Sequence, residues 1–90
     1  MKNKIVLITG ATSGIGWATA LEFKKAGAKL ILCGRRKERL ELLDNKLGGE
    51  QKLLNFDVRD KNDVFKSFES LPENWKDIDL LINNCLLYTS

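Results

Sequence analysis

Residues 4 to 16, KIVLITGATSGIG, decide how the rest of the chain is arranged. The four residues from Ile5 to Ile8 are apolar without alternation, which predicts a strand covered on both faces within a parallel sheet. Glycines follow at positions 10, 14 and 16, and an apolar-periodic segment comes next. A buried strand, a glycine-rich turn and a helix start are together typical of a phosphate-binding loop.

The chemistry of this turn indicates a pyrophosphate ligand. Glycines let the backbone turn sharply and approach a ligand without a Cβ in the way, and Gly16 leaves room for the helix to lie close to the strand. The helix start presents free N–H groups and the positive end of its dipole. The alternative is that Gly10 only ends a strand and Gly14 only starts a helix. The residues expected to contact the ligand are Gly10, Thr12, Ser13, Gly14, Ile15 and Gly16.

The segment TGATSGIG, residues 9 to 16, resembles the cofactor loop T-G-x-x-x-G-I-G of the short-chain dehydrogenase/reductase family. The resemblance covers residues 4 to 84 and implies a Rossmann-type sheet that binds a nicotinamide dinucleotide. Residues 71 to 79, LPENWKDID, look most like the subgroup of NADP-dependent serine 3-dehydrogenases and 3-hydroxy acid dehydrogenases. Members of that subgroup oxidise the β-hydroxyl of serine, allo-threonine or related acids. Pro72 and Trp75 could equally be a helix-stop residue and a core residue.

Composition limits the chain to one domain at most, with 90 residues and 43% hydrophobic content. The net charge of +3 comes from 15 basic and 12 acidic residues spread over the whole length, which does not favour nucleic-acid binding. Cys33 and Cys85 have no metal-type spacing, and the chain has no His, so both read as reduced hydrophobic residues. The apolar run before Thr9 is too short for a leader or a membrane span. We therefore expect a cytoplasmic protein without a metal site or a membrane partner.

Strands and helices alternate along the whole chain, which predicts a doubly wound α/β fold with right-handed crossovers. Four strands joined by three helices give a Rossmann-type βαβαβαβ half-sheet in the order 3-2-1-4. The ligand crevice is then expected at the carboxyl edge beside the first strand, where the winding direction reverses. The expected strands after the first are residues 29–33, 52–56 and 78–82, and the first helix is expected over residues 14–26.

Apolar spacing predicts the face that each helix buries. In the first helix Ile15, Ala18 and Leu21 recur at three-residue spacing with Phe23 nearby, and Gly27 is the expected stop. The second helix has one apolar face formed by Leu40, Leu43 and Leu47, and the third has one formed by Val64, Phe65, Phe68 and Leu71 before Pro72.

Two arginines follow the second strand, and no carboxylate stands there: the residues are Cys33, Gly34, Arg35 and Arg36. The adenosine ribose lies against this strand end, about 20 residues beyond the loop. An acid would hydrogen-bond a free 2′-hydroxyl, whereas guanidinium groups pair with a 2′-phosphate, each contact contributing roughly 1.5 to 3 kcal/mol. We therefore predict that Arg35 and Arg36 select NADP(H). The alternative is that both are exposed charges at a helix start, where their sign is mildly unfavourable.

Polar residues also follow the third and fourth strands. Asp57-Val58 resembles the D-V pair of the family, in which the Asp side chain and the next backbone unit frame the adenine ring, although an Asp there can simply cap a turn. Asn83-Asn84 resembles the first half of the family's N-N-A-G, which packs against the cofactor and steadies the sheet; alone it is an ordinary turn signal. The resemblance adds Asp57, Val58 and Asn84 to the expected cofactor contacts.

The resemblance ends after Asn84, where the family expects Ala-Gly and this chain has CLLYTS. We expect residues 1–84 to be part of one NADP-binding domain and residues 85–90 to be a non-native tail. Tyr88 and Ser90 are not expected to be catalytic, because family members use a Ser and a Tyr-x-x-x-Lys, and no Lys follows Tyr88. No catalytic residue is assigned within the chain.

The resulting hypothesis is an N-terminal cofactor-binding fragment of an NADP-dependent short-chain oxidoreductase, inactive alone. The resemblance implies that the complete enzyme acts on a small hydroxy or keto substrate, serine, allo-threonine or a 3-hydroxy acid, and is a homo-oligomer, typically a tetramer. One alternative is a non-catalytic dinucleotide-binding or interaction module. Another is a family reductase for a different substrate class, such as a 3-oxoacyl carrier-protein reductase.

Overall fold

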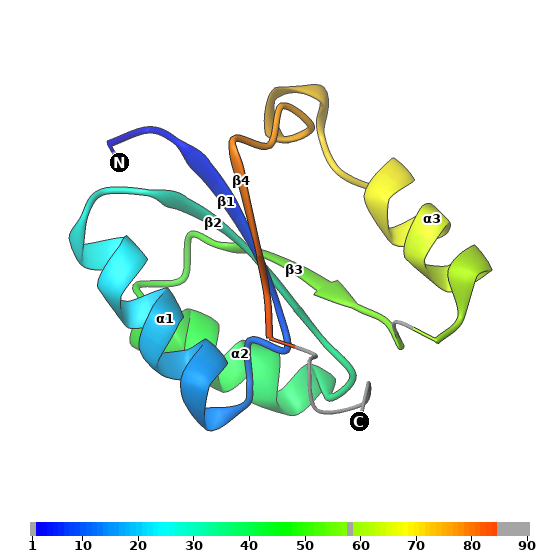
Figure 1. Cartoon of the computed structure of the whole chain (residues 1–90), viewed down its shortest axis with the longest axis horizontal. Coiled ribbons are helices and arrows are strands. Elements are labelled where there is room, and N and C mark those ends of the chain that lie inside the picture. The colour runs from blue at the N-terminus through cyan, green and yellow to red at the C-terminus, as the bar shows by residue number, and fades with distance from the viewer. Residues whose placement is uncertain (1, 58, 85–90) are drawn as a thin grey trace.

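Strands and helices alternate through the residues that the computed structural model describes, which are 2–57 and 59–84 (Figure 1). Each strand is followed by a helix that returns the chain to the start of the next strand, as a parallel sheet requires. The elements in chain order are β1 (Ile5–Thr9), α1 (Gly14–Lys25), β2 (Lys29–Gly34), α2 (Lys37–Lys46), β3 (Lys52–Asn55), α3 (Lys61–Glu69), the short 3-10 helix η1 (Glu73–Trp75) and β4 (Leu80–Asn83).

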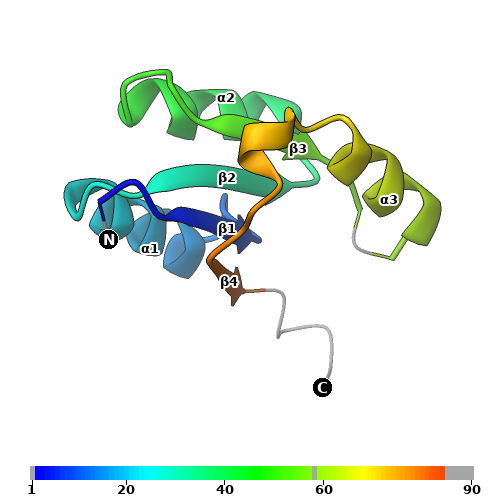
Figure 2. The ribbon, with the colours of Figure 1, turned by 90° about the horizontal axis from the view of Figure 1, so that it is seen from above.

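The strands form one parallel sheet in the order β3-β2-β1-β4, which confirms the predicted fold class and strand order (Figure 2). In the middle of the sheet Leu7 of β1 pairs with Ile31 of β2 on one side and with Leu81 of β4 on the other. Because all strands run the same way, their carboxyl ends meet at one edge. The chain reverses its winding direction between β1 and β4, beside the glycine loop.

Both faces of β1 and β2 are covered, which explains their continuous apolar runs. Helices α1 and α2 cover one face and α3 covers the other (Figure 2). On the α1 and α2 side the core contains Val6, Ile8, Leu30 and Leu32 of the strands with Ala20, Leu40, Leu43 and Leu47. On the α3 side it contains Ile5, Leu7, Ile31, Cys33, Leu54, Phe56 and Leu71, with Val64, Phe68, Trp75 and Ile78 packed against it.

The buried face of α1 agrees only in part with the one that three-residue spacing predicted, since Leu21 and Phe23 pack against the core but two other predicted residues do not. Ile15 is 74% exposed and Ala18 is exposed, whereas Gly16 and Ala20 are buried. The reason is the contact between Gly16 and the loop, because that contact fixes which side of the helix meets the sheet. Residues 16, 20 and 23 then fall on the buried side at i, i+4 and i+7.

The second helix agrees with its prediction, since Leu40, Leu43 and Leu47 are buried, and the third agrees in part. Phe65 is 71% exposed, because Val64 and Phe68 at i and i+4 define the side of α3 that packs on the sheet and Phe65 lies off that side.

The fourth strand begins two residues later than predicted, at Leu80. Asp79 precedes it and accepts a hydrogen bond from the Ile5 amide at 2.9 Å through Oδ2, while its own N–H donates to the Ile5 carbonyl at 2.9 Å. The strand lies at the edge of the described sheet, and Leu81 is 60% exposed. None of the helices formed by residues 2–57 and 59–84 has both the length and the apolar character needed to cross a lipid bilayer.

Candidate functional site

The turn after β1 depends on the absence of two Cβ atoms. Gly10 has a φ of 59°, a left-handed conformation that favours glycine, and a Cβ there would also lie 3.2 Å from the Asn84 carbonyl oxygen. A Cβ on Gly16 would overlap the carbonyl oxygen of Gly10 and lie 2.9 Å from Ala11 Cα. The first turn of α1 therefore packs directly against the loop backbone, as the sequence predicted for Gly16.

Ser13 closes the loop and caps the helix at the same time. Its hydroxyl donates to the Gly10 carbonyl at 2.8 Å and accepts the Gly16 N–H at 3.1 Å, and its own N–H donates to the Gly10 carbonyl at 3.1 Å. A side-chain oxygen at the N-cap that accepts from the third helical residue is the usual helix-capping arrangement. The Ser13 hydroxyl proton is thus engaged inside the loop in this structure.

Gly14 and Ile15 present the open side of the same turn. Gly14 is exposed, and a Cβ on it would meet no other atom within 4 Å among the described residues. Both residues belong to the first turn of α1, where backbone N–H groups have no carbonyl one turn earlier in the helix. The loop therefore combines a closed, backbone-packed side at Gly16 with an open side at Gly14 that can admit a ligand close to the backbone.

The end of β4 lies against the loop. Thr9 donates through its hydroxyl to Asn83 Oδ1 at 2.8 Å and accepts the Asn84 N–H at 3.2 Å. The Asn84 side-chain amide nitrogen is buried, and the described residues offer it no hydrogen-bond partner. A buried donor without a partner costs free energy unless something outside the described structure satisfies it.

The end of β2 forms what we call the arginine corner, residues Gly34, Arg35 and Arg36. It is joined to the loop because the Ala11 N–H donates to the Cys33 carbonyl at 3.0 Å, and a Cβ on Gly34 would lie 3.6 Å from Thr12 Oγ1. Both arginines are exposed, and Arg36 is the N-cap of α2. An arginine side chain cannot accept a hydrogen bond, so it is a poor cap and leaves this helix start suited to an anion.

The carboxylate of Asp57, two residues beyond β3, is held by Arg59. Arg59 Nη2 donates to Oδ2 at 2.9 Å and Nε donates to Oδ1 at 3.1 Å, while the Arg59 backbone N–H donates to Oδ1 at 2.9 Å. These hydrogen bonds, with a smaller contribution from the Arg35 charge, lower the pKa of Asp57 to about 2. Asp57 is therefore an ionised hydrogen-bond acceptor at neutral pH.

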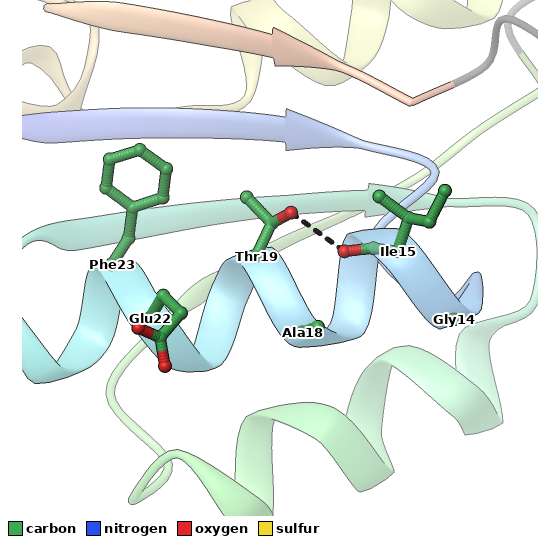
Figure 3. Close-up of a pocket in the computed structure, with 6 residues that line it drawn as sticks. All are labelled: Gly14, Ile15, Ala18, Thr19, Glu22 and Phe23. Atoms are coloured by element: carbon green, nitrogen blue, oxygen red, sulfur yellow. Dashed lines mark hydrogen bonds between the residues drawn. The ribbon is translucent and has the colours of Figure 1, made fainter.

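A shallow groove of about 460 Å³ runs along α1, lined by Gly14, Ile15, Ala18, Thr19, Glu22 and Phe23 (Figure 3). Thr19 is bonded within the helix, since its hydroxyl donates to the Ile15 carbonyl at 2.7 Å. The groove shares Gly14 and Ile15 with the loop and otherwise leads away along the helix. It contains no other predicted site residue, so we place the candidate site at the strand ends and not in this groove.

The structure brings the predicted residues to the carboxyl ends of adjacent strands. Ser13, Gly16 and Asn84 lie against Gly10, while Arg35 and Arg36 follow β2 and Asp57 follows β3. Val58 lies outside the described residues. Sequence reasoning missed Thr9, which ties β1 to the end of β4, and Arg59; the D-x-R spacing of Asp57 and Arg59 was the available signal for the latter.

Comparisons with known proteins agree with this arrangement. A family model described as short chain dehydrogenase matches residues 4–87. Serine 3-dehydrogenase of Rhizobium radiobacter is 49% identical over 79 residues, which are 88% of this chain and 32% of that protein. An NADP-dependent 3-hydroxy acid dehydrogenase of Salmonella typhi is 45% identical over 80 residues, 89% of this chain and 32% of that protein.

A solved structure described as the closed form of serine dehydrogenase complexed with NADP+ superposes with a TM-score of 0.81 at 42% identity. The match covers 86% of this chain and 31% of that one. The chain thus spans about a third of the length of each of these three proteins. The resemblance that the loop and residues 71–79 suggested is confirmed.

Proposed function

The chain belongs to the short-chain dehydrogenase family, and from that membership we propose that it binds NADP(H) as the cofactor-binding part of an oxidoreductase. One observation carries the proposal. The open glycine turn and the arginine corner lie at the ends of adjacent strands and are joined by the 3.0 Å hydrogen bond from Ala11 to Cys33. The proposed diphosphate site and the proposed 2′-phosphate site are therefore neighbours.

The loop suits a diphosphate because its open side at Gly14 presents backbone with no side chain in the way. Gly14 leaves space for an anion to approach the N–H groups of the first helical turn, and the helix dipole favours negative charge there. Ser13 acts in this proposal mainly by holding the loop shape, since its hydroxyl is engaged with Gly10 and Gly16. The unpartnered Asn84 amide beside the loop is a further donor that a bound cofactor could satisfy.

Arg35 and Arg36 distinguish NADP from NAD in this proposal. Their guanidinium groups can pair with a 2′-phosphate in forked, charge-assisted geometry, and the corner offers no carboxylate in its own residues, 34 to 36, for a free 2′-hydroxyl. Asp57 and Val58 follow the next strand and are proposed to frame the adenine ring. The ionised Asp57 carboxylate can accept a hydrogen bond from the exocyclic amine of adenine.

The proposed reaction is that of the serine and 3-hydroxy acid dehydrogenases that this chain resembles. When bound, NADP supplies the hydride acceptor for oxidation of a β-hydroxyl. The residues proposed here position the adenosine and diphosphate half of the cofactor, and none of them is given a catalytic role. A cytoplasmic location, a homo-oligomeric complete enzyme and a non-native tail at residues 85–90 remain predictions.

Binding measurements on the ninety-residue chain test the cofactor assignment. Calorimetry should give tighter binding of NADP than of NAD to the native chain. Changing Arg35→Ala and Arg36→Ala together should weaken NADP binding about 100-fold or more, if each lost contact contributes roughly 1.5 kcal/mol or more, and change NAD binding little. Lys66→Ala, at an exposed position of α3, is the control for loss of positive charge. Equal losses for both nucleotides would contradict the 2′-phosphate assignment.

A chimera tests the substrate class. Residues 4–84 of this chain would replace the matching segment of the Rhizobium radiobacter serine 3-dehydrogenase, with the rest of that enzyme unchanged. The chimera should oxidise serine, allo-threonine or 3-hydroxy acids with NADP in preference to NAD, and the preference should disappear with the double arginine variant. A folded chimera that binds NADP but turns over none of these hydroxy acids would contradict the subgroup assignment.

A further inference from the structure

The Asp57 carboxylate is held by Arg59, and the charge of a second arginine, Arg35, also acts on it. Arg59 holds it from its own turn, through both the side chain and the backbone. The carboxylate is partly shielded, with 34% of the Asp57 side chain exposed against 74% for Arg59. The turn is further fixed because the Asp60 N–H donates to the Asp57 carbonyl at 2.9 Å.

Counting hydrogen bonds shows how much of this carboxylate is in use. An ionised carboxylate has about four acceptor positions, two on each oxygen. Among the described residues, Oδ1 accepts two N–H groups of Arg59, at 2.9 and 3.1 Å, and Oδ2 accepts Nη2 at 2.9 Å. The Nε contact to Oδ2 is longer, 3.3 Å, and shares a proton already directed at Oδ1. About one acceptor position therefore remains on Oδ2.

We propose that Arg59 is a positioning residue that fixes the Asp57 carboxylate so that one free acceptor on Oδ2 selects a 6-amino purine against a 6-oxo purine. This inference rests on the proposed function, because it assumes that the adenosine end of NADP lies beside Asp57. A 6-amino group can donate to the remaining acceptor. A 6-oxo group places its own lone pairs against a carboxylate that cannot turn away or offer a proton, so it is rejected.

The competing explanation is that Arg59 and Asp57 form only a surface ion pair that stabilises the turn before α3. Exposed ion pairs generally contribute little to stability, and such a pair would leave nucleotide selection unaffected. The two explanations differ in what they predict for the purine base. If the pair is only structural, substituting Arg59 changes the unfolding midpoint or has no effect. If Arg59 positions the carboxylate, substituting it changes the ratio of affinities for two nucleotides that differ only at position 6 of the base.

The test uses NADP and its 6-oxo analogue, nicotinamide hypoxanthine dinucleotide phosphate, as probes of the ninety-residue chain. Calorimetric titrations would be made on the native chain, on Arg59→Ala and on Arg59→Lys, with Lys66→Ala as the control for charge. Lysine keeps a positive charge but lacks the planar fork that contacts both oxygens, so it separates positioning from charge alone. Thermal unfolding of each variant identifies any that fails to fold. If Arg59→Ala fails to fold, Arg59→Lys provides the test.

The native chain should bind NADP about 10- to 100-fold more tightly than the 6-oxo analogue, the range for one hydrogen bond to a charged group. Both Arg59 variants should reduce that ratio to about threefold or less and leave the preference for NADP over NAD unchanged, whereas Lys66→Ala should keep the native ratio. Native discrimination in a folded Arg59 variant would overturn the inference while leaving the proposed function intact. A native chain that binds neither nucleotide would overturn the proposed function and the inference with it.

Discussion

The glycine loop after β1 and the arginine corner after β2 lie at neighbouring strand ends, but one offers mainly backbone groups and the other offers side chains. The loop presents backbone at its open side, and its shape depends on the absence of side chains at Gly10 and Gly16 and on the Ser13 hydroxyl. The corner is made of two long, exposed side chains, those of Arg35 and Arg36. The loop is therefore part of the fold, whereas the corner is a surface that the fold presents.

From this difference we expect the loop to provide affinity for either cofactor and the corner to provide specificity for NADP. A diphosphate common to NAD and NADP would bind at the loop, whose backbone is fixed to the rest of the fold because Gly16 packs on the Gly10 backbone. The feature that tells the two cofactors apart would bind at the part that can be exchanged freely. Each prediction below changes one side of this comparison and asks whether the other side responds.

The largest effect is expected from Gly16→Val. Its Cβ would overlap the Gly10 carbonyl, so the helix must move away from the strand, at a cost of at least about 3 kcal/mol in unfolding free energy. Urea denaturation followed by circular dichroism should show this loss, together with loss of binding of both cofactors. A variant with native stability would mean that the contact between α1 and the loop is wrong.

Gly14→Val should separate binding from folding. The added side chain projects into open space, so the unfolding free energy should change by only about 1 kcal/mol. The same side chain fills the space proposed for the diphosphate, and both NADP and NAD should lose at least about 100-fold in affinity. Calorimetry checks this, and retained tight binding of either nucleotide would place the diphosphate elsewhere.

Ser13→Ala should weaken the loop without filling it. It removes the hydrogen bond to the Gly16 N–H and the bond to the Gly10 carbonyl, which should cost about 0.5 to 2 kcal/mol of stability. Affinity for both nucleotides should fall by a similar factor, because the loop is proposed to hold the diphosphate, which NAD and NADP share. A selective loss of NADP binding in titrations with the two cofactors would contradict this division of roles.

The smallest effect on stability is expected from the ionisation of Asp57, which depends on charge and hydrogen bonding and not on the shape of the loop. Its pKa is about 2 in the folded chain against an ordinary value of 3.8, so its contribution to stability is present above about pH 4 and is lost as the pH falls towards 2. In Arg59→Ala the pKa should rise towards 3.8, as carbon NMR of the carboxyl group can measure. An unchanged pKa would show that Arg59 is not its cause.

The parts of the molecule that local chemistry determines could be predicted from the sequence. The run Ile5 to Ile8 is apolar without a break because both faces of β1 are covered, and the glycine spacing reflects a turn that only glycine permits at positions 10 and 16. These features identified the fold and the strand order.

Contacts between distant or paired side chains could not be predicted in the same way. Ile15 appeared to belong to the buried face of α1, but the contact of Gly16 with the loop turns it outward. Arg59 appeared to be one surface charge among many until its geometry on Asp57 was visible. The periodicity of the sequence does not report either effect, because each depends on the direction of a side chain after folding.

Phosphorus NMR of NADP bound to this chain tests the central claim most directly, because it reports the 2′-phosphate separately from the diphosphate. With Arg35 and Arg36 beside it, the bound 2′-phosphate should stay dianionic as the pH is lowered from about 8 to about 5, below its ordinary second pKa of about 6. In the double arginine variant it should titrate near its ordinary value. A bound 2′-phosphate that titrates like the free nucleotide in the native chain would contradict the account.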